Sequence, residues 1–114
     1  MRENILMDKA LSFAVRIVKL SKILYDNKHK IIANQILRSG TSIGANVAES
    51  VYASSKADFV NKLYIAQKEA SETKYWLVVL NKVEYIEQNI FDSLYKDITE
   101  LMSIIGSSLN TAKR

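Results

Sequence analysis

The chain has 114 residues and a formal charge of +4; 48% of the residues are hydrophobic, and there is no proline, no cysteine and one histidine. This length allows one hydrophobic core, so we expect a single domain over residues 1–114. The absence of cysteine excludes disulfides and thiolate sites, and a single histidine excludes imidazole clusters, so no cofactor is expected. No apolar run approaches the ~20 residues that span a bilayer, and the first residues do not resemble a signal peptide, so we expect a cytoplasmic protein without a membrane partner.

The first helix is predicted over residues 3–25. Its apolar residues recur in steps of four and three, which is typical of the core of a helix bundle. They are Leu6, Ala10, Phe13, Ile17, Leu20 and Leu24.

Basic residues are concentrated in the first third of the chain. Residues 1–40 hold eight Lys or Arg against three acidic residues, whereas the remainder holds eight against nine. Those on the first helix and in the connection after it are Arg16, Lys19, Lys22, Lys28 and Lys30. They form either a solvated helix face or a surface that contacts phosphates.

A turn is predicted at residues 26–29, because Asn and Asp tolerate turn conformations, and His29 is expected to lie in it. The second helix is predicted over residues 30–52. In this helix the only charged residues after its first are Arg38 and Glu49. A helix with so little charge is usually covered on more than one side.

Two glycines interrupt the second helix. Gly40 and Gly44 each cost roughly 1 kcal/mol relative to alanine inside a helix, so their presence requires a reason. With Ala48 they form a row of small residues at a spacing of four, against which another helix can pack closely. The alternative is that residues 39–41 form a loop between two short helices.

The third helix is predicted over residues 56–83, capped by Ser54 or Ser55 with Asp58 in the manner of a capping box. Its core-facing residues are Phe59, Leu63, Ala66, Ala70, Thr73, Leu77 and Leu80. A second apolar row lies about 110° around the helix and contains Ile65, Trp76, Val79 and Val83. Glu72 falls in this second row. Because a carboxylate is costly to bury alone, we expect it to have a partner, with Arg38 the first candidate and Asn46 the second.

The fourth helix is predicted over residues 90–109, with Phe91, Leu94, Ile98, Leu101, Ile105 and Leu109 facing inward. Short connections between four helices favour antiparallel neighbours, so the predicted fold is all-α, an antiparallel up-down-up-down four-helix bundle. The extra apolar sides of the second and third helices require a further partner, and we expect a homo-oligomer. The candidate interface residues are Ala45, Tyr52, Ile65, Trp76, Val79 and Val83.

Three groups of residues form a distinctive pattern: Gln35-Ile-Leu-Arg-Ser-Gly-Thr-Ser-Ile-Gly-Ala-Asn-Val-Ala-Glu49, then Asp58-Phe59 with Leu63-Tyr-Ile-Ala66, then Ala70-Ser-Glu72. This pattern resembles that of the four-helix bundle proteins named after the intervening sequences of bacterial 23S ribosomal RNA. The resemblance covers nearly the whole chain. It departs at Ser50, where the family usually has glycine. This departure predicts that the second helix extends further at its C-terminal end than in the family.

The resemblance implies antiparallel bundles that assemble as rings, typically pentamers. The family is similar to the accessory protein of diversity-generating retroelements, whose pentameric basic barrel engages a reverse transcriptase and nucleic acid. The polar residues that carry the family motif are Arg38, Ser39, Ser42, Asn46, Glu49, Ser71 and Glu72. In one interpretation, Arg38, Asn46, Glu49 and Glu72 form a buried hydrogen-bond and ion-pair set that fixes helix register or the subunit interface. In the other, some of the motif residues line a surface for a ligand or nucleic acid.

The leading functional hypothesis is a non-enzymatic oligomer that associates with RNA or DNA. The candidate contact residues are Arg16, Lys19, Lys22, Lys28, Lys30 and Arg38. The alternative is a scaffold for a protein client, such as a reverse transcriptase, without direct nucleic-acid binding. An enzyme is not expected, because the carboxylates of Glu49 and Glu72 have neither a nucleophile nor a histidine to work with. The Gly40-Thr-Ser-Ile-Gly44 segment also lacks the Gly-Lys-Ser/Thr run of a phosphate loop.

Overall fold

A computed structural model describes residues 2–113, and the side chains from Ile5 onward. This part of the chain forms four α-helices: α1 (Arg2–Asp26), α2 (Lys30–Val51), α3 (Lys56–Lys82) and α4 (Gln88–Ala112). The prediction of an all-α four-helix bundle is confirmed. The helix that differs most from its predicted bounds is α4, which begins earlier and continues further.

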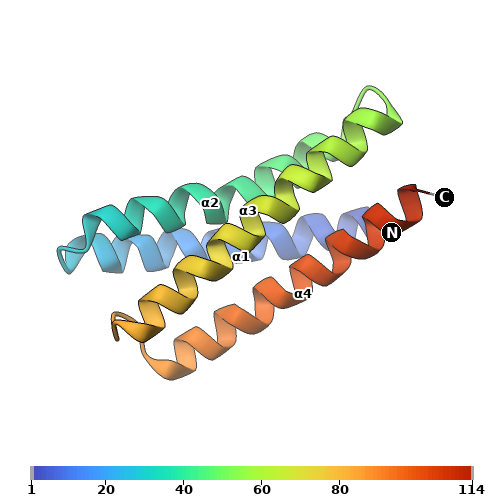
Figure 1. Cartoon of the computed structure of the whole chain (residues 1–114). Coiled ribbons are helices and arrows are strands. Elements are labelled where there is room, and N and C mark those ends of the chain that lie inside the picture. Colours follow the sequence, from blue (N-terminus) through green and yellow to red (C-terminus); the bar gives the residue numbers. More distant parts are fainter. Residues whose placement is uncertain (1, 114) are drawn as a thin grey trace.

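Figure 1 shows each helix running opposite to the one before it, with the α3–α4 pair crossing the α1–α2 pair at an angle. The bundle is elongated, with extents of 45 × 21 × 19 Å. Helix α2 packs closely on both α1 and α3, whereas α1 and α4 are the neighbours that approach each other least. The α1–α2 and α3–α4 connections lie together at one end of the bundle, which we call the turn end (Figure 1).

The hydrophobic core contains one row of side chains from each helix, which is the arrangement that the spacing of four and three predicts. Its largest fully buried members are Phe13, Ile17, Leu24, Ile36, Ile43, Leu63, Leu77, Leu80, Leu94, Ile98, Leu101 and Ile105. A buried polar contact joins α1 to α2 beside this core, because the hydroxyl of Ser21 donates to the carbonyl of Ala33 over 3.1 Å.

Local chemistry sets the helix ends. At the start of α3 the hydroxyl of Ser55 accepts from the backbone N–H of Asp58 (3.1 Å), while the Asp58 carboxylate accepts from the N–H of Ser54 (3.2 Å). The predicted cap is therefore confirmed. At the turn end, Lys28 and Glu84 adopt left-handed backbone conformations, with φ of 73° and 61°, and reverse the chain after α1 and after α3.

Helix α2 is continuous through residues 39–41, so the loop alternative is wrong. A Cβ atom added to Gly40 would lie 2.7 Å from Cγ2 of Ile17, so this glycine is the point at which α1 packs against the backbone of α2. At Gly44 the same atom would lie 3.5 Å from the carbonyl oxygen of Ala10, which is an ordinary contact. The row of small residues therefore receives α1 of the same chain.

Among the described residues, no helix combines the length and the apolar composition that crossing a membrane requires.

Replacing Gly40 with alanine should lower the free energy of unfolding by about 1–3 kcal/mol, because the new methyl group overlaps the side chain of Ile17. Ile17 is β-branched and has little freedom to move aside. Gly44→Ala is the matched control, and it should stabilise the protein by up to about 1 kcal/mol, since its methyl group fits and alanine favours the helix. Urea unfolding followed by circular dichroism measures both, and equal stabilisation by the two changes would contradict the close approach.

Candidate functional site

Two polar residues of the family motif, Arg38 and Glu72, lie in a charged cluster between α2 and α3. The guanidinium of Arg38 on α2 contacts Glu69, with 3.2 Å between Nη1 and Oε1, and pairs through Nη2 with Oε2 of Glu72. The indole N–H of Trp76 donates to the same Glu72 oxygen over 3.0 Å. The prediction that Arg38 would be the partner of Glu72 is therefore confirmed, and Glu69 and Trp76 join the cluster.

A buried polar contact lies one residue along from this cluster on each helix. The hydroxyl of Thr73 donates to the hydroxyl of Ser39 over 2.8 Å, and both residues are completely buried. The motif serine is therefore part of the α2–α3 packing surface. A buried hydroxyl is costly to leave without a partner, so this pair helps to fix the register of the two helices.

The cluster perturbs the titration of both its principal members. The Trp76 indole and the Arg38 guanidinium stabilise the ionised carboxylate, so the pKa of Glu72 lies below its usual value. The hydrogen bond that Arg38 donates to Glu72 likewise raises the pKa of Arg38. The cluster nevertheless lies at the surface of the chain, with half of the Arg38 side chain and 37% of the Glu72 side chain exposed.

The other motif residues do not join this cluster. Ser42 and Asn46 each bond to a backbone carbonyl one turn earlier in α2, at 2.6 and 2.8 Å. Glu49 pairs with Lys62 on α3 (3.2 Å), and Ser71 is exposed. The hypothesis of one buried polar set is therefore wrong for the single chain, as is the second-choice pairing of Asn46 with Glu72. Ser50 is buried and bonds to the carbonyl of Val47, and α2 ends one residue later.

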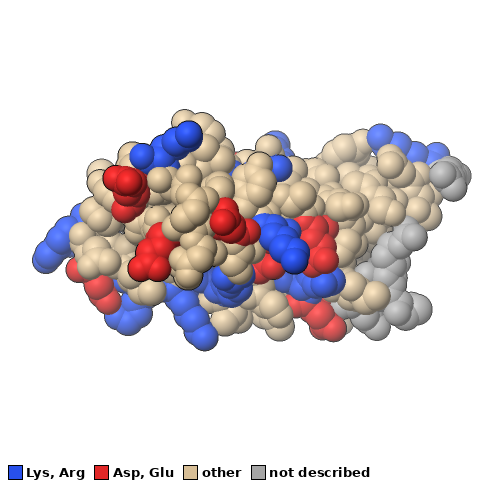
Figure 2. All heavy atoms as spheres, turned by 90° about the horizontal axis from the view of Figure 1, so that it is seen from below, with Lys and Arg blue, Asp and Glu red and all other residues tan. Residues whose placement is uncertain are grey.

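Carboxylates already engage half of the predicted nucleic-acid contacts. Arg16 pairs with Asp97 of α4, Lys22 pairs with Asp26 one turn later, and Arg38 is held as described above. Figure 2 shows one face of the molecule, on which basic and acidic side chains are intermixed and do not form a continuous basic surface.

Three of the predicted basic residues remain free of carboxylates. Lys19 and Lys28 have no carboxylate partner among the described side chains, and Lys30 lies over the ring of Tyr25, 5.1 Å from its centre. All three belong to the last two turns of α1, the α1–α2 turn or the start of α2. The free positive charge of the predicted basic set therefore lies toward the turn end.

An aromatic stack joins the two connections at this end. The rings of His29 and Tyr85 are nearly parallel, with 3.5 Å between their centres and 11° between their planes. His29 lies in the predicted turn, but its contact with Tyr85 was not predicted, because the two residues are far apart in the sequence and no local spacing relates them.

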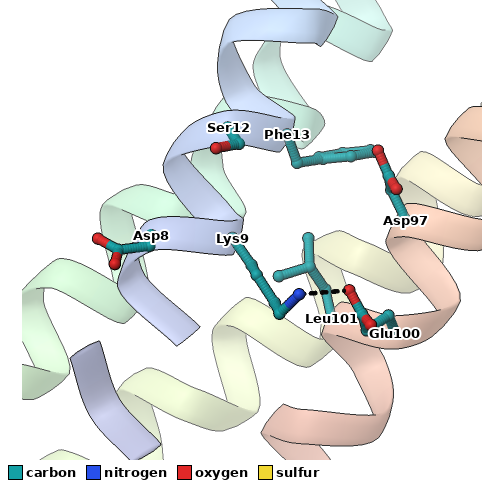
Figure 3. Close-up of a pocket in the computed structure, with 7 residues that line it drawn as sticks. All are labelled: Asp8, Lys9, Ser12, Phe13, Asp97, Glu100 and Leu101. Carbon is teal, nitrogen blue, oxygen red and sulfur yellow. Dashed lines mark hydrogen bonds and ion pairs between the residues drawn. The ribbon is translucent and has the colours of Figure 1, made fainter. Parts of the chain in front are cut away.

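Two hollows lie along the seam between α1 and α4. Toward the turn end, a groove of about 490 Å³ has a mainly apolar lining, and we call it the turn-end groove. Its apolar residues are Leu20, Ile23, Tyr85, Ile86, Ile90 and Leu94. Figure 3 shows the smaller hollow, of about 250 Å³, where an ion pair between Lys9 and Glu100 (2.9 Å) crosses from α1 to α4. Among the described residues there is no group of three or more His, Cys, Asp or Glu that could hold a metal ion.

The candidate interface residues differ in exposure. Tyr52 is 88% exposed and Val83 48%, whereas Trp76 is half-buried and packs against the core of its own chain. Ala45 is exposed, and Ile65 and Val79 are half-buried. An exposed apolar row on α1, which was not predicted, consists of Leu11, Val15 and Val18. Their spacing of four and three was the signal that could have revealed it.

The model of the 23S rRNA-intervening sequence protein family matches residues 2–107. A crystal structure of a protein of unknown function from the S23 ribosomal protein family of Bacteroides thetaiotaomicron VPI-5482 is 50% identical to this chain, with a TM-score of 0.94. The match covers 96% of this chain and 99% of that one. Among curated proteins, none matches.

The charged cluster predicts a pH effect that Trp76, the only tryptophan of the chain, reports. Because the pKa of Glu72 is depressed in the folded state, its contribution to stability is present above the unfolded value of about 4.3 and is lost as the pH falls through the folded value. The indole N–H resonance of Trp76 should therefore shift with a midpoint below about pH 4.3. Glu72→Gln should abolish this shift, and Glu69→Gln, the control, should keep it. A midpoint at or above the unfolded value would contradict the cluster.

Proposed function

The chain belongs to the 23S rRNA-intervening sequence protein family, and on this premise we propose that it is a non-enzymatic, self-associating helical bundle that binds RNA or DNA near its turn end. The observation that carries the proposal is the position of Lys19, Lys28 and Lys30, which no carboxylate neutralises among the described side chains. Lysines in this state can exchange their counterions for phosphates, which is the main source of nucleic-acid affinity.

The environment of the carboxylates supports a role without catalysis. Glu49 is paired with Lys62, whereas Glu72 is held by Arg38 and Trp76. The two groups therefore have separate partners and do not act on a common point as a general acid and base would. The ordinary role of such ion pairs is to hold two helices in register, here α2 and α3.

Self-association supports the binding proposal by adding charge. We propose a ring of five copies, the arrangement that the family resemblance implies. A formal charge of +4 for each chain would give about +20 for the ring, a field that attracts polyanions. The apolar side chains that one chain leaves in water, Leu11, Val15 and Val18 on α1 together with Tyr52, support burial against another copy.

A second candidate function is a scaffold for a protein client such as a reverse transcriptase. The exposed row on α1 favours it, because exposed apolar rows on a helix commonly mark protein contacts. In this case the lysines at the turn end would be incidental, and the purified protein would not bind nucleic acid.

Replacing Lys19, Lys28 and Lys30 together with glutamine should weaken binding to generic RNA and DNA. The plot of log affinity against log salt should become shallower by about 2–3, because roughly 0.7–0.9 counterions are released for each phosphate contact. Fluorescence anisotropy at several salt concentrations measures both quantities.

The matched control replaces Lys56, Lys68 and Lys113, which are exposed and lie away from the turn end, with glutamine. It changes the net charge by the same amount and should alter the salt dependence much less. An equal effect of the two triple variants would contradict the assignment to the turn end.

Light scattering should give a mass that is a multiple of the 12.9 kDa chain, about 64 kDa for five copies. Replacing Leu11 and Val15 with glutamate should lower this mass, because charges would enter the proposed contact. Replacing Ser103 and Ser107, an exposed pair with the same spacing on α4, with glutamate should leave the mass unchanged. A wild-type mass of 12.9 kDa at micromolar concentration would contradict self-association.

A further inference from the structure

The turn-end groove exists because α1 and α4 are the neighbouring helices that approach each other least. Its base is formed by core residues, since Leu20 is 7% and Leu94 2% exposed. Its sides remain partly in water, with Ile23 58% and Ile90 39% exposed. The groove is therefore a preformed apolar surface of about 490 Å³ that nothing in the described chain covers.

One wall of the groove is a fixed aromatic ring. Tyr85 follows the left-handed residue Glu84, and its backbone N–H donates to the carbonyl of Leu80 over 3.0 Å, which turns the chain back toward the bundle. The stack with His29 then holds the ring while leaving 44% of the residue exposed. A ring fixed in this way can stack on another flat group at little cost in side-chain entropy.

Free positive charge lies on one side of this ring. Lys19 of α1 lines the groove, and Lys28 and Lys30 are the chain neighbours of His29, the residue stacked on Tyr85. The acidic groups at this end are Asp26, which is paired with Lys22, Glu84, which precedes Tyr85, Glu87, which lines the groove, and Asp92 near the start of α4. A polyanion would therefore follow the α1–α2 side, where Lys19, Lys28 and Lys30 lie, and avoid the α4 side.

An apolar slot with an aromatic wall and adjoining cations matches the chemistry of an unpaired nucleotide. In a duplex the faces of the bases are covered by their neighbours, whereas a single strand can turn a base onto an aromatic side chain and place its phosphates on nearby lysines. The apolar lining offers few hydrogen-bonding groups that distinguish one base from another. The site is therefore suited to single strands with little sequence preference.

We propose that the turn-end groove binds single-stranded nucleic acid, with one unstacked base against Tyr85 and the adjoining phosphates on Lys19, Lys28 and Lys30. This inference rests on the proposed nucleic-acid binding and adds to it the class of nucleic acid and the residue that holds the base.

The test measures anisotropy with fluorescent oligothymidylate of about ten nucleotides and with a duplex of the same length. The wild-type protein should bind the single strand more tightly. Tyr85→Ala should weaken single-strand binding about 5- to 100-fold and leave its salt dependence unchanged, because stacking releases no counterions. Lys19→Gln should instead make the salt dependence shallower by about 0.7.

The matched control is Tyr64→Ala, since Tyr64 is 45% exposed, lies beneath Lys113 and belongs to the opposite half of the bundle. It should leave the affinity unchanged. Ile23→Glu is the second test variant, because its exposed position tolerates a charge and the new carboxylate would enter the groove and repel phosphates. Circular dichroism checks that each variant is folded.

The outcomes separate this inference from the proposed function. Equal affinity for single strand and duplex, or no effect of Tyr85→Ala and Ile23→Glu, would overturn the inference and leave general nucleic-acid binding in place. A lower mass in light scattering for Ile23→Glu, with unchanged affinity, would show that the groove is a contact between copies and would also overturn it. The absence of any nucleic-acid binding by the wild-type protein would overturn the proposed function itself.

Discussion

The structure depends on the close approach of α1 to α2 at Gly40. The side chain of Ile17 occupies the space that a Cβ atom at this position would need, so the two helices can approach this closely here only because residue 40 has no side chain. This constraint explains why a helix tolerates a residue that disfavours helix formation. It also explains the low charge of α2, which is covered by α1 on one side and by α3 on another.

The side of α2 that faces α3 makes polar contacts, one of them buried and the others partly exposed. The buried hydroxyl pair of Ser39 and Thr73 lies beside the half-exposed cluster in which Arg38 meets Glu69 and Glu72. Hydroxyl pairing inside and charge pairing outside both require the same alignment of α2 and α3. Packing of α1 fixes the depth of α2 in the bundle, and these polar contacts fix its position along α3.

Sequence periodicity was sufficient for the fold, because each core row follows from the spacing of apolar residues along one helix. The Ser55 cap was predictable for the same reason, since all its atoms lie within one turn. The pairing of Arg38 with Glu72 required only that the two faces meet, and the place of Glu69, one turn before Glu72, could have been inferred. By contrast, the contact of Arg16 with Asp97 and the stack of His29 on Tyr85 depend on how elements far apart in the sequence are aligned along the bundle axis. The sequence alone does not specify that alignment, nor the gap between α1 and α4 that forms the groove.

The weak contact between α1 and α4 also bears on how the bundle moves. Helix α4 packs closely on α3 alone, whereas α2 is clamped between two neighbours. Regions with fewer packed contacts open at lower free energy than the whole protein unfolds, so amide hydrogens of α4 should exchange with solvent while those of α2 are still protected. Helix α4 would then move away from α1 while staying packed on α3. The width of the turn-end groove beside Tyr85 would increase with this movement.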